Sequence, residues 1–505
     1  MYDPPKLGVG ITYFPEIDDF VRENADFINV LEVEPQTHWY QLKSPTTTPP
    51  ASKYRINFDV LERIKKLPQK KIVHSVATPV GGKRSLDPSQ FPYLELTTKE
   101  LDALWFSEHL SFNTASFKEK EFETSFFLCP LQTYLGIKGS VECINTLSNE
   151  IKLPFAIENG ANYLQLREDE ISDGDFIGSI IERADCGLIL DLHNLWTNQV
   201  NGRQSIKDFL KRICRHRVWE IHLAGGTDDE EEGYYIDAHT GEIPKKLIDI
   251  TKEIINYFPN LSALIFEVSP SYLKKINYDV SFLKEQLDIL HVLWQLRNNN
   301  CQYDNNSSFN NNNWIRNDVF FTGQNPNPSH WENILGSLVL DLEGLQDDCS
   351  NFGSDEEKII IKRLKSDPAI KLINRIIFEV RASSIVTTML FTSRLLLIYL
   401  DTEGFTNLLK KFFKEFTPSL FGNIEAKNFH KFLQDYRSIE FLDEALSVDM
   451  AMLSFAVDRT TQRLVLSKNP STLMKSLLSY KLPSFTQDGA FQLEIGEDGI
   501  RSIML

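Results

Sequence analysis

The feature that most constrains the fold of this chain is a regular alternation of short apolar runs with longer amphipathic stretches between residues 7 and 297. Helical patterns such as Phe58–Leu67 and Pro244–Phe258 separate runs that are rich in β-branched and aromatic residues. The eight predicted strands are Leu7–Tyr13, Phe27–Glu34, Lys71–Val76, Leu104–His109, Leu153–Asn159, Gly187–Leu192, Val218–Ala224 and Ala263–Val268. Eight alternating units of this kind favour a closed (β/α)8 barrel, a TIM barrel of the α/β class, over an open sheet.

A polar tract then interrupts the chain. Nine of the sixteen residues from Asn298 to Asn313 are asparagine, and such a tract cannot bury enough apolar surface to offset its ordering entropy. Beyond it the pattern is mainly helical, for example at 331–345 and 369–391, and Ala490–Leu505 alternates around two glycines as a hairpin does. We therefore predict a barrel domain at 1–297, an Asn-rich linker at 298–313 and a mainly α domain at 314–505.

Composition narrows the class of protein. The formal net charge of the 505 residues is −17, which argues against a nonspecific nucleic-acid binder. The longest apolar stretch, Ala382–Leu400, is interrupted by Arg394 and reads as a buried helix rather than a membrane span. No secretory signal pattern opens the sequence, and the six cysteines form no CxxC pair. We expect a cytoplasmic protein with reduced thiols and with neither a nucleic-acid nor a membrane partner.

Histidines and carboxylates gather at the ends of the predicted strands, where barrel enzymes build their active sites. Six of the eight strands end in such residues. Residues two apart on a strand face the same way, so Asp191 and His193 are both expected to point into the barrel mouth. The candidates are His74, Glu108, His109, Glu158, Asn159, Asp191, His193, Asn194, His222, Asp237, His239 and Glu267.

This arrangement favours metal binding. One buried histidine or aspartate in a barrel is commonly a hydrogen-bonded structural residue, but repetition over successive strands is harder to explain that way. Carboxylates that converge on one cavity repel each other unless protons or cations compensate them. Mixed imidazole and carboxylate ligands suit iron, manganese or zinc, and their number predicts two or three ions.

Five segments add a resemblance to a known family. They are SEHLSF at Ser107, ENGANYL at Glu158, DLHNLW at Asp191, EIHLAGGTDDE at Glu220 and IDAHTG at Ile236. In this order they resemble the multinuclear non-haem iron-dependent oxidative enzymes, the family that includes the methanobactin-biosynthesis oxidase. The resemblance implies a xylose-isomerase-like barrel, two or three irons in mixed Fe(II) and Fe(III) states, dioxygen as cosubstrate and a ribosomal precursor peptide as substrate. Carried over by position, it implies metal contact by His74, His109, Glu158, Asp191, His222, Asp237, His239 and Glu267.

The chain departs from the family pattern at three places. Many members have Asn-Asn after the strand-six aspartate, whereas this chain has His193 and Asn194. The Asn-His-Gly that often follows is reduced to Asn201-Gly202, and Gly226 replaces a second histidine after strand seven. We hypothesise that His193 replaces a lost ligand, and we include His193 and Asn194 among the metal-binding candidates. The number of metals and the substrate stay open.

The second domain carries a fainter resemblance. Phe432–Asp458 resembles the small partner proteins that present the precursor peptide to these oxidases, which implies a partner fused in cis. The alternative is a generic helical domain with apolar residues at helical spacing.

The expected function is thus an iron-dependent oxidase or oxygenase that modifies Cys, Asp or Asn in a ribosomal peptide during natural product biosynthesis. One alternative is a divalent-metal isomerase or hydrolase, although no lysine stands at a strand end for the proton transfer of an isomerase. A second alternative is a peptide-binding scaffold with a degraded metal site.

Overall fold

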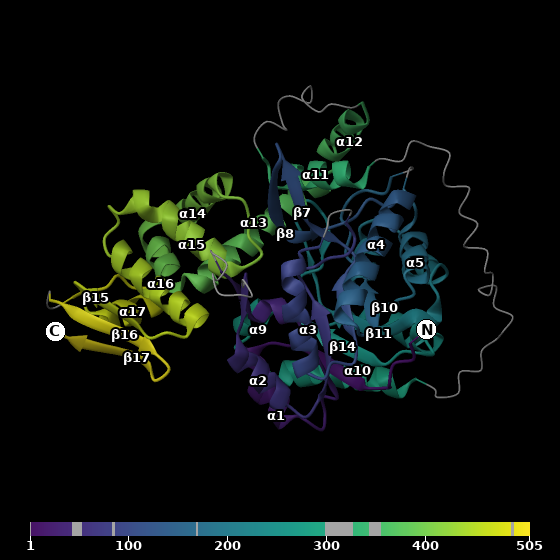
Figure 1. The fold of residues 1–505 in the computed structure, drawn as a ribbon, viewed down its shortest axis with the longest axis horizontal. Coiled ribbons are helices and arrows are strands. Elements are labelled where there is room, and N and C mark those ends of the chain that lie inside the picture. The colour runs from purple at the N-terminus through teal and green to yellow at the C-terminus, as the bar shows by residue number, and fades with distance from the viewer. Residues whose placement is uncertain are drawn as a thin grey trace. The chain divides into compact units, whose positions relative to one another are not determined.

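The computed structural model describes residues 2–42, 53–82, 86–167, 170–297, 327–342, 355–485 and 489–505. The chain divides into two compact units (Figure 1). Unit 1 comprises Met1–His38, Phe58–Glu119 and Phe127–Ile373, and unit 2 comprises Trp39–Asn57, Lys120–Phe126 and Asn374–Leu505. The predicted linker at 298–313 lies outside the described residues, so the domain limits placed beside it stay predictions, and the compact units divide the chain after Ile373.

Unit 1 is built on a closed barrel of eight parallel strands, which confirms the predicted fold. Their order around the barrel is β1-β14-β11-β10-β9-β6-β5-β2, closed by the pairing of β1 with β2. All eight predicted strands are present: β1 (Gly8–Tyr13), β2 (Val30–Val33), β5 (Lys70–Ser75), β6 (Phe106–His109), β9 (Phe155–Glu158), β10 (Gly187–Asp191), β11 (Val218–Ala224) and β14 (Ala263–Glu267). Strands such as GLILD and ALIFE are apolar up to their final carboxylate because both of their faces are buried.

Helices cover the outside of the barrel (Figure 1). Those of unit 1 are α1 (Asp18–Glu23), α2 (Phe58–Lys66), α3 (Phe91–Glu100), α4 (Tyr134–Ile151), α5 (Asp173–Arg183), α6 (Leu192–Val200), α7 (Ile206–Leu210), α8 (Lys245–Ile254), α9 (Pro270–Lys275), α10 (Val280–Gln295), α11 (Pro328–Val339) and α12 (Asp355–Lys365). Side-chain caps define several of their starts. Thr133, for example, accepts a hydrogen bond from the Gly136 amide where α4 begins, and Ser172 does the same for the Asp175 amide at α5.

An apolar layer fills the barrel below the strand ends. It consists of Val30, Ile72, Trp105, Ala156, Ile189, Trp219, Ala263 and Ile265. Side chains two residues further along a strand point to the same interior one layer higher. That step leads from Val30 to Glu32, from Ala156 to Glu158 and from Ile189 to Asp191. The polar layer therefore rests on a floor that excludes water from below.

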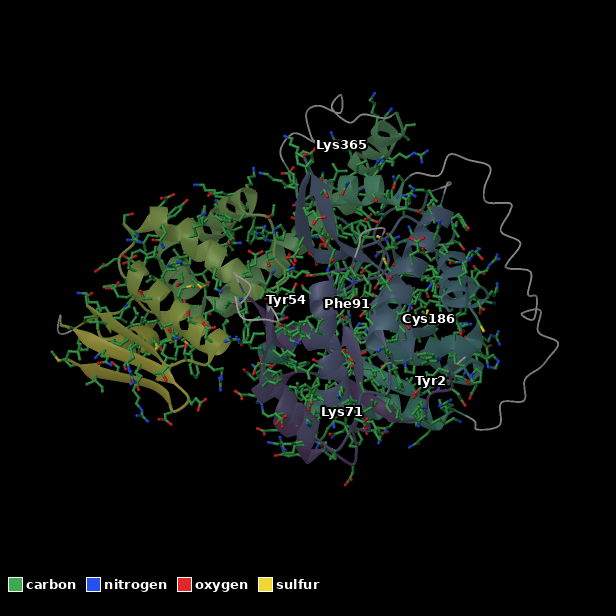
Figure 2. All side chains as sticks on the ribbon, viewed as in Figure 1. Tyr2, Tyr54, Lys71, Phe91, Cys186 and Lys365 are labelled. Atoms are coloured by element: carbon green, nitrogen blue, oxygen red, sulfur yellow. The ribbon has the colours of Figure 1, made fainter. Side chains whose placement is uncertain are left out.

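The N-terminal segment closes the opposite end of the barrel. The Tyr2 ring packs edge-on against Trp219 with centroids 5.1 Å apart, and its hydroxyl donates to the Leu104 carbonyl at 3.4 Å. Figure 2 labels Tyr2 together with Lys71 and Cys186, which stand at or just before the starts of β5 and β10. These residues mark the end of the barrel away from the polar layer.

Three hairpin-like insertions interrupt the alternation, and none of them was predicted. They pair β3 (Trp39–Gln41) with β4 (Tyr54–Ile56), β7 (Phe112–Phe117) with β8 (Lys120–Leu128), and β12 (Thr227–Asp228) with β13 (Tyr235–Ile236). Within unit 1, α11 packs on β7: the Ser116 amide donates to Asn333 Oδ1 at 2.8 Å, and Trp331 Nε1 donates to the Cys129 carbonyl at 3.0 Å. Residues after the predicted linker thus belong to the same compact unit as the barrel.

Unit 2 is mainly helical, as predicted. Its helices are α13 (Ala369–Thr388), α14 (Leu390–Glu415), α15 (Gly422–Phe432), α16 (Leu442–Asp458) and α17 (Pro470–Leu478), and a sheet is formed by β15 (Gln462–Leu466), β16 (Phe491–Gly496) and β17 (Gly499–Met504). The predicted terminal hairpin is confirmed as β16 and β17, joined at the Gly496–Gly499 pair. Asn423 holds the inserted β3 by hydrogen bonds to the Gln41 amide and carbonyl at 3.2 and 2.7 Å.

The apolar stretch Ala382–Leu400 is not one helix, in contrast to the prediction. Helices α13 and α14 meet at Met389, and both contribute to a core that includes Ile385, Leu395 and Phe412. Within the described ranges, no single helix is long and apolar enough to cross a membrane. By length and composition alone the α13–α14 pair would pass that test together, bent by 112°.

The close approach of Gly187 to Trp219 provides a test of the barrel packing. A Cβ atom at residue 187 would lie 2.4 Å from the indole, so Gly187→Ala should destabilise the barrel by about 1–3 kcal/mol. No heavy atom lies within 4 Å of a Cβ at Gly160, so Gly160→Ala should change stability by less than about 0.5 kcal/mol. Urea unfolding followed by tryptophan fluorescence measures both, and equal midpoints for the two variants would contradict the assigned packing.

Candidate metal centre

The strand ends bring the predicted residues together in one row of overlapping groups. Their ligand atoms lie within 4.8 Å of one another in each group. The groups are His74–His109–Glu158, Glu158–Asp191–His222, Asp191–His239–Glu267 and His193–Asp237–His239. Glu158, Asp191 and His239 each belong to two neighbouring groups. Shared ligands are what a centre of several adjacent cations requires.

At one end of this row of groups, Glu158 lies between two imidazoles. Glu158 Oε2 is 2.9 Å from His74 Nε2 and 3.1 Å from His109 Nδ1, and the two Nε2 atoms of the histidines are 3.2 Å apart. The Ser107 hydroxyl contacts His74 Nδ1 at 2.9 Å, which fixes the ring from behind. His74, His109 and Glu158 therefore project from β5, β6 and β9 toward a common point.

The middle of the centre is fully buried. His222 Nδ1 lies 3.1 Å from Glu267 Oε1 and 3.8 Å from Glu158 Oε1. The Asn194 amide Nδ2 donates to Asp191 Oδ2 at 2.9 Å and to Glu158 Oε1 at 3.3 Å, so it orients both carboxylates. Asn194 therefore lies beside the candidate ligands, and its Oδ1 atom is buried and without a hydrogen-bond partner.

At the other end Asp237 joins two histidines. Its Oδ1 atom is 2.7 Å from His193 Nδ1 and 3.1 Å from His239 Nε2. His193 Nε2 lies 3.2 Å from the Tyr235 hydroxyl, so both nitrogens of this ring already have protein partners. A Cβ atom at Gly226 would lie 2.7 Å from His193 Nε2, and the glycine therefore leaves the space that this imidazole fills.

The reason given for the direction of His193 was wrong. Strand β10 ends at Asp191, whose carboxylate caps helix α6 by accepting the Asn194 amide at 2.7 Å. His193 consequently stands in the first turn of a helix and not two residues further along a strand. Asp237 and His239 do converge, but His239 has a φ of +49°, so the loop that carries them is not extended there.

Uncompensated polar atoms test whether these residues suit a metal. Among the described side chains, buried atoms that make no hydrogen bond include Glu158 Oε2, Asn194 Oδ1, both nitrogens of His222, His239 Nε2 and Glu267 Oε2, although several of them lie in the ion-pair contacts given above. An unpartnered buried polar atom is costly, and here such atoms face one another across the barrel mouth. Bound cations would satisfy them, so the residues fit a metal centre made of imidazole and carboxylate ligands.

The electrostatics of the centre point the same way. Burial, followed by the charges of Glu267 and Glu158, raises the pKa of Asp191 well above its usual range. Burial alone lowers the pKa of His74, but Glu32 and Glu158 outweigh it and raise that pKa to about 10. The protein's own charges therefore leave protons on groups that could otherwise bind cations.

One side of the centre is open. His239, Asp237 and His109 have exposed side-chain fractions of 33%, 18% and 17%, whereas Glu158 and His222 are at 2% or below. The Phe127 ring lies over His109 with the ring centroids 4.2 Å apart. A substrate would reach the centre along this side.

Two carboxylates near the centre escaped the sequence interpretation. Glu32 on β2 and Glu220 on β11 form a further group with His222, and all three are fully buried. Burial and then the charge of Glu32 raise the pKa of Glu220 to about 7. The signal was present in the sequence, because Glu32 follows Val30 and Glu220 precedes His222 by the two-residue step that sets a common strand face.

A closed parallel barrel with a mixed histidine and carboxylate cluster at the carboxyl ends of its strands defines a (β/α)8 protein with a candidate metal centre. Residues 22–271 match the model of the family described as RiPP precursor modification enzyme MbnB/TglH/ChrH. The barrel of this chain belongs to that family.

Curated relatives carry the name UPF0276 protein. The one from Rhizobium meliloti is 31% identical over 198 residues, which cover 37% of this chain and 62% of the relative, so the chain spans less than two thirds of that relative's length. The one from Shewanella loihica is 25% identical over 283 residues, 55% of this chain and 94% of the relative.

Solved structures with a similar fold include a xylose isomerase domain containing protein from Salmonella typhimurium. It is 14% identical, with a TM-score of 0.38 over 58% of this chain and all of that chain. A D-psicose 3-epimerase is 12% identical, with a TM-score of 0.37 over 57% of this chain and 98% of that chain.

Cation binding to this centre should release protons. A ligand atom loses its proton before it binds a metal, and a pKa of about 10 means that His74 is protonated near neutral pH, while the pKa of Asp191 is also raised by burial and by the charges of Glu267 and Glu158. Affinity for zinc should therefore fall as pH falls and rise with pH up to about 10, the pKa of His74. Calorimetric titration in buffers of different ionisation enthalpy should show at least about one proton released per ion.

The matched control is His291→Gln. His291 lies outside the centre, where its Nε2 atom contacts the Phe27 carbonyl at 2.8 Å, so this variant should release the same number of protons as the wild type. Zinc binding without proton release would contradict the assigned ligands.

Proposed function

We propose that this protein is an iron-dependent enzyme that uses dioxygen to oxidise a cysteine, aspartate or asparagine side chain of a ribosomally made peptide. The observation that carries the proposal is the row of overlapping ligand groups, in which Glu158 and Asp191 are shared between neighbouring groups. Membership of the RiPP precursor modification family supports a peptide substrate. The donor set of imidazoles and carboxylates supports iron, since it suits that metal as well as manganese and zinc.

Eight side chains would hold two or three iron ions: His74, His109, Glu158, Asp191, His222, Asp237, His239 and Glu267. Such a centre supplies the electrons for dioxygen reduction and the positive charge that holds a substrate thiolate or carboxylate. His193 is retained as a further candidate, although its contacts with Asp237 and Tyr235 equally suit a residue that orients Asp237.

Residues around the centre would prepare it for the substrate. The Thr78 amide and hydroxyl donate to Glu108 at 2.9 and 2.7 Å, and Glu108 in turn accepts the His109 amide at 2.8 Å. This network fixes the end of β6 and therefore the direction of His109. On the open side, Phe127 shields His109 from water, and the Tyr163 hydroxyl accepts the Asp237 amide at 3.0 Å.

The mainly helical unit would serve the same reaction in cis. The segment Phe432–Asp458, which resembles the family's partner proteins, spans the end of α15 and all of α16. Its residues Leu446 and Leu453 help to form the core of unit 2. We propose that this unit presents the precursor peptide, and that the enzyme acts in the cytoplasm, a location supported by the free thiols of Cys129, Cys143, Cys186 and Cys214.

Co-expression with peptides encoded beside its gene tests the proposal. The wild-type chain in aerated cells should change the mass of one such peptide at a Cys, Asp or Asn residue, and exclusion of dioxygen should abolish the change. Glu158→Gln removes a ligand shared by two groups, so it should abolish the modification and lower the iron content by at least about one ion per chain.

His291→Gln is again the control, because it leaves every proposed ligand in place. Modification that persists without dioxygen, or activity retained with zinc in place of iron, would favour a divalent-metal isomerase or hydrolase. A protein that binds no metal and only retains the peptide would favour a recognition scaffold.

A further inference from the structure

The imidazole of His222 stands between two sets of carboxylates. Its Nδ1 atom faces the proposed centre, 3.1 Å from Glu267 Oε1. Its Nε2 atom faces away from that centre, 3.1 Å from Glu32 Oε2 and 3.5 Å from Glu220 Oε1. The side chains of His222, Glu32 and Glu220 are completely buried, so water does not compete for these contacts.

Each of the two outer carboxylates is anchored through one oxygen only. The Thr12 hydroxyl donates to Glu32 Oε1 at 3.0 Å, and Trp105 Nε1 donates to Glu220 Oε2 at 3.3 Å. The remaining oxygens, Glu32 Oε2 and Glu220 Oε1, have no partner other than His222 Nε2, at 3.1 and 3.5 Å. Both free carboxylate oxygens are therefore directed at the same imidazole nitrogen.

The chemistry of imidazole restricts what these atoms can do. A neutral imidazole carries one proton, so a nitrogen that binds a cation requires the proton to reside on the other nitrogen. A carboxylate beside that second nitrogen attracts the proton and fixes the ring orientation, as is usual behind metal-bound histidines. Glu32 is the nearer of the two acceptors, and it is held in place by Thr12, its register partner on β1.

We propose that Glu32 is a positioning residue: its free oxygen keeps the proton of His222 on Nε2 and thereby leaves Nδ1 to bind a cation of the centre. The inference rests on the proposed metal centre, but not on iron, dioxygen or a peptide. Glu220 is 0.4 Å farther from Nε2 (3.5 against 3.1 Å) and contributes less to holding the proton.

The direct test is the proton itself. Zinc-loaded protein with ¹⁵N-labelled histidine is diamagnetic, and the resonances of His222 are assigned by their loss in His222→Gln. A slowly exchanging proton on Nε2 of the wild-type protein is expected. The absence of any proton on Nε2 would overturn the proposal, because that nitrogen would then bind a cation of its own together with Glu32 and Glu220.

Two isosteric variants separate the carboxylates. Glu32→Gln removes the negative charge that attracts the Nε2 proton, and should weaken zinc binding by about 10- to 100-fold in competition with a chelator. Glu220→Gln should weaken it by no more than about threefold, since the more distant carboxylate is not the main acceptor. Equal losses in both variants, or no loss in Glu32→Gln, would contradict the assigned role.

A third variant controls for general destabilisation. Asp449 in unit 2 is a buried carboxylate that accepts the Phe391 and Thr392 amides at 3.2 and 2.7 Å. Asp449→Asn should lower stability and leave the zinc affinity of the barrel unchanged. Because zinc is the probe throughout, these results stay interpretable if the protein proves to catalyse no peptide oxidation.

Discussion

The mutual repulsion of buried carboxylates at the barrel mouth is the constraint on which the rest of the structure depends. Glu158, Asp191 and Glu267 stand one layer above an apolar floor, and no water reaches them from below. Imidazoles from the strands β5, β6 and β11 and from the loop that carries His239 lie between them and compensate part of their charge. Several buried oxygens and nitrogens that face one another still make no hydrogen bond. Bound cations would satisfy these atoms.

The barrel fold can hold these buried carboxylates in place despite their mutual repulsion. Eight parallel strands place their carboxyl ends on one rim, so each strand needs to supply only one or two ligands. The hydrogen-bonded ladders and the packed floor hold those side chains in place, while the loops beyond them are free to vary. His193 and Gly226 illustrate this freedom. The imidazole of His193, which projects from helix α6, fills the space that a side chain at residue 226 would occupy.

The sequence alone predicts the barrel and most of the residues of the candidate metal centre. The eight barrel strands follow from apolar runs with buried faces, and the clustering of His74, His109, Glu158 and their partners follows from their positions at strand ends. The predicted strand Gly187–Leu192 extends past the point where α6 begins at Leu192, although an aspartate before a helix is a common cap. Glu32 is not the last residue of its predicted strand, and only the two-residue step from Val30 places it on the interior face.

Other features depend on contacts that one sequence does not display. The short strands β3 and β4 lack a strong strand pattern, and β3 is held by a partner far along the chain. Asn423, for example, binds Gln41 within unit 2. The break of the apolar stretch at Met389 likewise reflects packing around Ile385 and Leu395, which share one core across the bend.

The measurement that tests the central claim most directly is the metal content per chain after anaerobic purification from iron-supplemented cells, with Mössbauer spectra of the same sample. Two or three irons per chain are expected, with ferrous and ferric ions both present. A single tightly bound zinc or manganese ion, or a protein that retains no metal, would contradict this expectation.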